Sequence, residues 1–247
     1  MTGTILQKSV ALVKRALPVA IWSPIRAIAT GFITPIRFSR TTGHWKSSLR
    51  RSACNPSGEP IPWYTYPAID FLAQRKFDDC NILEFGGGQS TLWWSARARS
   101  VLTIEENVEW VTSLSPHIGG NVSLHYVPAD TEMRDIGPVR GILNTNPITK
   151  FDVIIIDGHL RRELTTLAFD HLALGGAIII DNAEGYEIYD ELKTMNCRRI
   201  DFYGFAPGVV SRHCTSLVFI EDCFLLSPDV PISNIELFIE GNAAQLR

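Results

Sequence analysis

The stretch "NILEFGGGQSTLWW", residues 81 to 94, decides the fold of this chain. A short apolar run is followed by three consecutive glycines, and a Ser-Thr pair with a second apolar run comes directly after them. Glycine tolerates positive φ and lets the backbone approach a ligand closely. Ser and Thr favour helix N-termini, whose free N–H groups attract anionic groups. The stretch therefore predicts a strand that turns sharply into a helix around a ligand.

The rest of the chain alternates between short apolar runs and segments with helical spacing, which is typical of a parallel sheet covered on both faces. The predicted strands are "NILEF", "SVLTIE", "NVSLHYV", "FDVIIID" and "GGAIIID". The predicted helices are "YPAIDFLAQRKF", "STLWWSARA", "NVEWVTSLSPHI", "RRELTTLAFDHLAL" and "YEIYDELKTM". Two last strand-like runs, "CRRIDFYGF" and "TSLVFIED", predict an antiparallel hairpin at the edge of the sheet. We therefore predict a doubly wound, mostly parallel α/β domain, with an irregular segment at 131–150 that acts as a lid.

The charge is divided unevenly along the chain. No Asp or Glu occurs before Glu59, and all 26 of them follow, together with 14 of the 23 Lys and Arg. The proline- and glycine-rich stretch "NPSGEPIPW", residues 55 to 63, marks a boundary. We predict a basic extension over 1–58 and an α/β domain over 59–247. The basic residues of the extension are Lys8, Lys14, Arg15, Arg26, Arg37, Arg40, Lys46, Arg50 and Arg51.

The extension begins with "ILQKSVALVKRAL", whose spacing predicts a basic amphipathic helix. Such a helix can lie on an anionic membrane surface. A helix packed on the domain and a cleaved targeting peptide are the alternatives. The following run, "ALPVAIWSPIRAIATGFITPI", contains three prolines and an arginine. We expect these to interrupt it, so it is interfacial at most. The predicted location is cytoplasmic, with peripheral membrane attachment left open.

The five cysteines form no C-x-x-C pair and no cluster with zinc spacing, which favours free thiols in a reducing compartment.

A carboxylate follows the glycine loop at a distance typical of nucleoside binding. Glu105 ends the next predicted strand, 21 positions after Glu84, where it can accept hydrogen bonds from both ribose hydroxyls. The dinucleotide pattern G-x-G-x-x-G is incomplete, because Thr91 stands three positions after Gly88.

With "LEFGGGQST" on the first strand and "TIEEN" on the second, residues 60 to 220 resemble the class I S-adenosylmethionine-dependent methyltransferases. The resemblance implies a seven-stranded Rossmann-like sheet and a cofactor site. Glu84 and the backbone of Gly86, Gly87 and Gly88 would hold the amino acid end of the cofactor, beside Ser90 and Thr91 at the helix N-terminus. Glu105 would bind the ribose, and Asp130 would lie by the adenine. Spermidine synthases also carry three glycines here, but they have paired aspartates where this chain reads "DGHLRRE".

Two further predicted strands end in polar residues, at Asp157 and at Asp181 with Asn182. Adjacent strand ends lie about 5 Å apart, so these oxygens can form a site for Mg²⁺ or a similar cation. The pair of motifs is similar to the metal-dependent O-methyltransferases of the catechol and caffeoyl-CoA type, in which the matching residues hold the metal. The alternative is that Asp181 and Asn182 only cap the next helix.

His159, two positions after Asp157, is placed to act as the base that deprotonates a hydroxyl, so His159 and Asp157 are the predicted catalytic residues. "IDGH" is also similar to sugar O-methyltransferases of antibiotic pathways. The lysine of the catechol type is absent, and Arg161 and Arg162 lie nearby instead, which favours an anionic or sugar-like acceptor. Trp63, Tyr64 and Tyr66 are candidates to cover the cofactor, and His213 is a second candidate base.

These features predict methyl transfer from S-adenosylmethionine to a hydroxyl of a small-molecule or saccharide acceptor, assisted by a divalent metal. The alternatives are a metal-independent methyltransferase acting on nitrogen or a carboxylate, and a non-catalytic cofactor-binding protein. The acidic domain carries no recognised RNA-binding module, so nucleic acid is not an expected partner. A homodimer is a further expectation.

Overall fold

The computed structural model describes residues 18–130, 134–185 and 188–226. The described residues divide into two units, 42–226 and 18–41. The amphipathic helix predicted within residues 5–17 lies outside the described residues. The segment 42–58, counted above with the extension, belongs to the first of these units and contains helix α3 (His44–Arg50).

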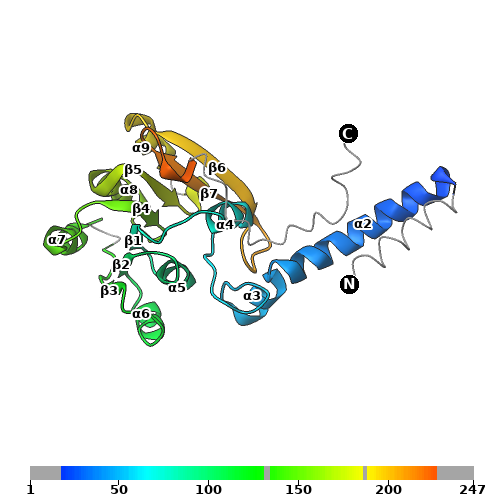
Figure 1. The fold of residues 1–247 in the computed structure, drawn as a ribbon, viewed down its shortest axis with the longest axis horizontal. Coiled ribbons are helices and arrows are strands. Elements are labelled where there is room, and N and C mark those ends of the chain that lie inside the picture. Colours follow the sequence, from blue (N-terminus) through cyan, green and yellow to red (C-terminus); the bar gives the residue numbers. More distant parts are fainter. Residues whose placement is uncertain (1–17, 131–133, 186–187, 227–247) are drawn as a thin grey trace. The chain divides into compact units, whose positions relative to one another are not determined.

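The domain is built on one seven-stranded sheet in the order β3-β2-β1-β4-β5-β7-β6. Five strands are parallel, and β7 pairs antiparallel with both β5 and β6, which confirms the predicted mostly parallel sheet with a closing hairpin (Figure 1). The strands are β1 (Asn81–Phe85), β2 (Ser100–Glu105), β3 (Val122–Tyr126), β4 (Phe151–Ile156), β5 (Leu172–Ile180), β6 (Arg198–Phe205) and β7 (Arg212–Phe219).

Helices cover both faces of the sheet, with α4, α5 and α6 on one side and α7, α8 and α9 on the other (Figure 1). Their bounds are α4 (Tyr66–Ala73), α5 (Gln89–Ser95), α6 (Val108–Leu114), α7 (Gly137–Thr145), α8 (Arg161–His171) and α9 (Ile188–Thr194). Short 3₁₀ turns occupy Ala183–Gly185 and Phe224–Leu226. The doubly wound arrangement is thus the one that the sequence predicts.

The two central strands explain why the sheet must be covered on both sides. Ile154, Ile155 and Ile156 of β4 are fully buried although successive side chains point to opposite faces. The paired residues of β5, from Ile178 to Ile180, are buried in the same way. Each such side chain stabilises the fold by roughly 1.5–3 kcal/mol, so these six hydrophobic residues favour a central position in the sheet.

Helix α7 corrects the prediction of an irregular segment over 131–150. It has Pro138 near its first position, where a missing N–H costs nothing, and it buries Val139 and Leu143 four positions apart. Gly137 and Gly141 conceal this pattern in the sequence, because glycine normally weakens a helix. The lid role predicted for this segment remains untested.

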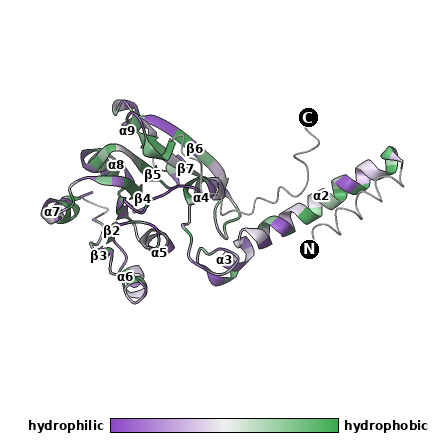
Figure 2. Cartoon of the chain, in the orientation of Figure 1, coloured by the Kyte–Doolittle hydropathy of each residue, from purple (hydrophilic) through white to green (hydrophobic). Residues whose placement is uncertain are grey.

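Helix α2 (Val19–Thr41) corrects the expectation that prolines interrupt the second apolar run. The helix continues for 23 residues with Pro24 and Pro35 inside it. By length and composition alone it is long and apolar enough to cross a membrane, a test that core helices and signal sequences also pass. None of its residues is buried, whereas in the domain the hydrophobic residues gather on the central strands (Figure 2).

The turn from β1 into α5 depends on Gly86. Its φ is +90°, and an added Cβ would lie 2.7 Å from the carbonyl carbon of Asp157 in the neighbouring strand end. The backbones of the two strand ends therefore approach each other more closely than a side chain allows.

We predict that Gly86→Ala lowers the free energy of unfolding by roughly 3 kcal/mol, because it adds both backbone strain and a backbone clash. Gly88→Ala is the matched control, since nothing lies within 4 Å of an added Cβ there. Urea unfolding of both variants measures the difference. Equal stability of the two variants would show that the close approach at Gly86 is not needed.

Candidate functional site

A cavity of about 240 Å³ opens at the carboxyl ends of β1, β2 and β4. Its walls contain many of the residues that the sequence singles out, because the ends of adjacent parallel strands meet at one rim. The predicted site residues among the lining are Gly86, Gly87, Gly88, Ser90, Glu105, Asp157 and His159. The other lining residues are Trp63, Gln89, Glu106, Asn107 and Trp110.

The glycine loop and Glu105 form one rigid wall of this cavity. The Gly87 N–H donates to Oε2 of Glu105, and the Asn107 N–H donates to Oε1 at 2.6 Å. Burial raises the pKa of Glu105, and these backbone donors oppose the shift. A carboxylate fixed in this way still has lone pairs free to accept hydrogen bonds from two adjacent hydroxyls of a ribose.

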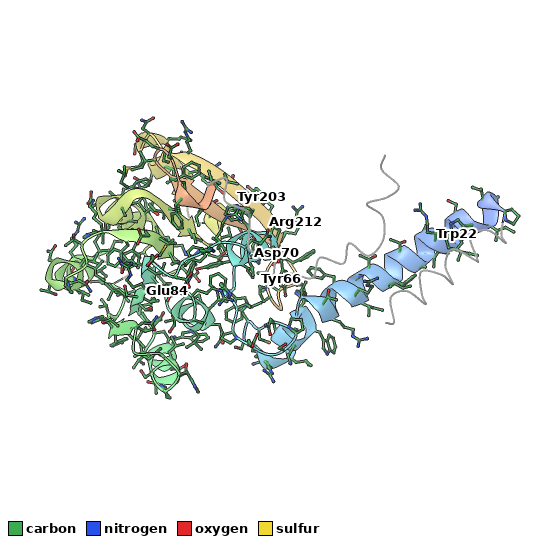
Figure 3. The ribbon with its side chains drawn as sticks, in the orientation of Figure 1. Trp22, Tyr66, Asp70, Glu84, Tyr203 and Arg212 are labelled. Atoms are coloured by element: carbon green, nitrogen blue, oxygen red, sulfur yellow. The ribbon has the colours of Figure 1, made fainter. Side chains whose placement is uncertain are left out.

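Glu84 lies beneath the glycine loop and does not line the cavity. Its carboxyl is fully buried within the sheet domain (Figure 3), where Oε2 accepts hydrogen bonds from Thr91 Oγ1 at 2.5 Å and Thr103 Oγ1 at 2.9 Å. Thr91 in turn accepts a hydrogen bond from the Gly88 N–H. Glu84 and Thr91 therefore brace the loop from below, and the predicted direct contact of Glu84 with a cofactor remains untested.

The other oxygen of Glu84, Oε1, is buried without a hydrogen-bond partner among the described residues. Such an orphaned acceptor is costly, and burial raises the pKa of Glu84 to about 7. The groups that a nucleoside would meet are those of the cavity wall, where the Glu105 carboxylate and the backbone of the glycine loop lie side by side.

Asp130 does not reach the main cavity. It follows β3 and forms an isolated β-bridge with Asp135. An adjoining hollow of about 30 Å³ is lined by Val127, Pro128 and Ala129, and it shares Gly86 and Glu106 with the main cavity. The prediction that Asp130 lies by an adenine remains untested.

Glu106 and His159 form a pair at the mouth of the cavity that the sequence analysis missed. Nδ1 of His159 contacts Oε1 of Glu106, and the His159 backbone N–H donates to the same carboxylate at 3.1 Å. The His159 side chain is 70% exposed, against 20% for Glu106. Glu106 therefore orients an imidazole whose Nε2 has no hydrogen-bond partner among the described residues. The second acid of "TIEEN" was the signal for this pair.

Arg161 occupies the place where the sequence predicts a metal. The residue is 5% exposed, and its guanidinium donates to Asp157 Oδ1 at 2.7 Å, to the Gly158 carbonyl and to the Asp181 carbonyl. Burial and the nearby Asp181 carboxyl raise the pKa of Asp157, while Arg161 opposes this shift. The positive charge at this rim is therefore supplied by the chain itself.

Each of the three predicted metal ligands has a hydrogen-bond partner within the chain. Asp157 pairs with Arg161, Asp181 Oδ1 accepts from Thr215 Oγ1 at 2.8 Å, and Asn182 Nδ2 lies 3.3 Å from His213 Nδ1. Within the described ranges, no group of three or more His, Cys, Asp or Glu could hold a metal ion. The predicted metal site therefore has no support in this arrangement.

His213 belongs to a separate cluster at the end of β5. Its Nδ1 lies 3.1 Å from Glu184 Oε1, and Nε2 lies 3.0 Å from Ser211 Oγ. It does not line the main cavity. Trp63 does, as expected, and its ring meets Trp110 edge to face with centroids 6.5 Å apart. Tyr64 and Tyr66 are buried instead of covering the cavity.

Comparison with solved structures identifies the fold. An O-methyltransferase from Bacillus cereus in complex with SAH is 15% identical with a TM-score of 0.52, covering 83% of this chain and all of that one. The cofactor-bound protein Rv0187 from MTB is 18% identical with a TM-score of 0.50, covering 77% of this chain and 96% of that one. The chain has the fold of the class I S-adenosylmethionine-dependent methyltransferases. No protein-family model and no curated protein matches its sequence.

For this methyltransferase fold, the pKa of Glu84 predicts a particular dependence of stability on pH. Because the folded-state pKa of about 7 exceeds the ordinary 4.5, the folded protein binds the proton more tightly than the unfolded chain. The stabilisation that this proton gives the folded protein is complete below pH 4.5 and is lost as the pH rises to about 7. Glu84→Gln cannot bind this proton, so its stability does not fall in this way. Between pH 4.5 and pH 7 its free energy of unfolding should therefore rise relative to that of the wild type by up to about 3 kcal/mol.

Urea unfolding of the wild type and of Glu84→Gln at several pH values between 4.5 and 7 measures this difference. Glu109→Gln, on the exposed face of α6, is the control and should follow the wild type. If the Glu84→Gln and wild-type curves run parallel, Glu84 does not bind a proton in this range.

Proposed function

We propose that the chain transfers a methyl group from S-adenosylmethionine to a hydroxyl of a small-molecule or saccharide acceptor. The observation that carries the proposal is that Glu105, the glycine loop and the Glu106–His159 pair share the walls of one cavity. The first two are suited to hold a nucleoside, and the pair is suited to remove a proton beside it.

The cofactor, when bound, supplies a methyl group on a sulfonium sulfur. The chain's own residues prepare the acceptor. His159 Nε2 would accept the hydroxyl proton as the hydroxyl oxygen takes up the methyl group that the cofactor would supply. Glu106 holds the imidazole at Nδ1 and stabilises the positive charge that His159 gains.

Trp63 and Trp110 support a role in positioning the reacting groups. Trp63 is held in place because its Nε1–H donates to the Pro207 carbonyl at 2.7 Å. An aromatic ring on the wall of the cavity attracts a sulfonium cation and packs against the face of a sugar ring.

Arg161 supports a mechanism in which no metal holds the acceptor. A buried guanidinium already pairs with Asp157. A second cation at the same place would meet electrostatic repulsion from Arg161. The base at His159 is then the group that activates the hydroxyl.

We predict that His159→Gln lowers kcat by about 10²–10⁴-fold, because the proton has no acceptor. Glu106→Gln should lower kcat less and leave KM nearly unchanged, as expected of a positioning residue. His171→Gln is the control, since it bonds the Thr149 carbonyl at the opposite end of the sheet and should retain wild-type activity.

Release of tritium-labelled product from methyl-labelled S-adenosylmethionine, assayed over a panel of phenols and saccharides, measures these rates. Activity should persist in EDTA. Full activity of His159→Gln would contradict the assignment of His159 as the base. Loss of activity in EDTA would support the prediction that a divalent metal assists the reaction. Cofactor binding without turnover on any acceptor would favour a non-catalytic protein of this fold.

A further inference from the structure

Helix α2 exposes a large apolar surface that nothing covers in the part of the chain that the structure describes. None of its residues is buried, and Phe32 and Ile28 are 72% and 62% exposed. The other exposed large hydrophobic residues of the helix are Val19, Ile21, Ile25, Ile33 and Ile36. A contiguous apolar surface of this kind marks a site of interaction with a partner or a membrane.

The polar residues of α2, apart from Ser39 and Arg40 near its C-terminal end, follow one narrow stripe. They recur every three or four positions, a spacing that places them on one side of a helix. At about 100° per residue the stripe occupies roughly a quarter of the circumference. Its members are Ser23, Arg26, Thr30, Thr34, Arg37 and Thr41. Hydrophilic positions accordingly recur along the whole length of α2 in Figure 2.

The positive charge of this region favours an anionic partner. Arg26 and Arg37 lie on the polar stripe, and no acidic residue occurs before Glu59. A helix with a broad apolar face and basic residues along its polar edge matches a lipid surface with anionic headgroups. Trp22, near the N-terminal end of α2 (Figure 3), is of a residue type enriched where membrane meets water.

We propose that α2 lies in the plane of an anionic lipid surface, with its apolar face among the acyl chains and Arg26 and Arg37 at the headgroups. The stripe favours this orientation over one across the membrane. A spanning helix would carry Arg26 and the threonines into the hydrocarbon, where polar groups are costly. In the plane, the entire stripe faces water and both arginines reach phosphate.

The test is flotation of the full chain with vesicles of phosphatidylcholine alone and of phosphatidylcholine mixed with phosphatidylglycerol. The wild type should bind the mixed vesicles strongly and the neutral ones weakly. Ile28→Gln with Phe32→Gln should abolish binding to both. Thr30→Gln with Thr34→Gln, the same change on the polar stripe, should leave binding intact. Arg26→Gln with Arg37→Gln should weaken binding to mixed vesicles by roughly tenfold or more.

Thermal unfolding of each variant checks that the domain is still folded, and N-terminal sequencing checks that α2 is present. Equal vesicle binding by Ile28→Gln with Phe32→Gln and by Thr30→Gln with Thr34→Gln would overturn the inference. So would the absence of vesicle binding by the wild type. If the wild type is a dimer that does not bind vesicles, and Ile28→Gln with Phe32→Gln makes it monomeric, the apolar face of α2 binds a second copy of the chain instead. Resistance to alkaline carbonate in membranes of expressing cells would mean that α2 spans them.

Discussion

The buried carboxyl of Glu84 connects the three segments on which the cavity depends. It lies on β1, accepts hydrogen bonds from Thr103 on β2 and from Thr91 at the start of α5, and through Thr91 reaches the amide of Gly88. A carboxyl with no access to water is costly, and this one leaves an oxygen unpaired. This arrangement holds the glycine loop at one position, where Gly87 donates to Glu105 in the same wall of the cavity.

A second constraint acts where β4 and β5 end. Two carboxyls placed on adjacent strands repel each other unless a cation lies near them. Arg161, one turn beyond Asp157, supplies that charge and bonds the Asp181 backbone as well. The rim is thereby stabilised by a residue of the chain, and the Glu106–His159 pair beside it keeps an imidazole exposed to the cavity.

The sequence predicts the sheet well because its strands are continuous apolar runs. It also predicts the turn after β1, because the backbone there passes too close to its neighbour for a side chain at Gly86. Glu105 and His159 could be placed at the cavity because Glu105 ends one predicted strand and His159 lies two positions after the end of another. The direction of Asp181 could not, because its partner Thr215 is 34 positions away and belongs to an antiparallel strand. Arg161 was read as a residue that faces the acceptor, since burial of an arginine depends on neighbours that periodicity does not reveal. Helix α7 was concealed by its glycines, and α2 by prolines that its helical backbone accommodates.

The central claim is that Glu105 and the glycine loop hold the nucleoside of S-adenosylmethionine. Calorimetric titration of the wild type and of Glu105→Ala with S-adenosylhomocysteine tests it most directly. We predict one binding site per chain with micromolar affinity in the wild type, and a loss of roughly tenfold or more in the variant, which removes hydrogen bonds made by a charged group. The absence of binding in the wild type, or equal affinity in the two proteins, would contradict the account.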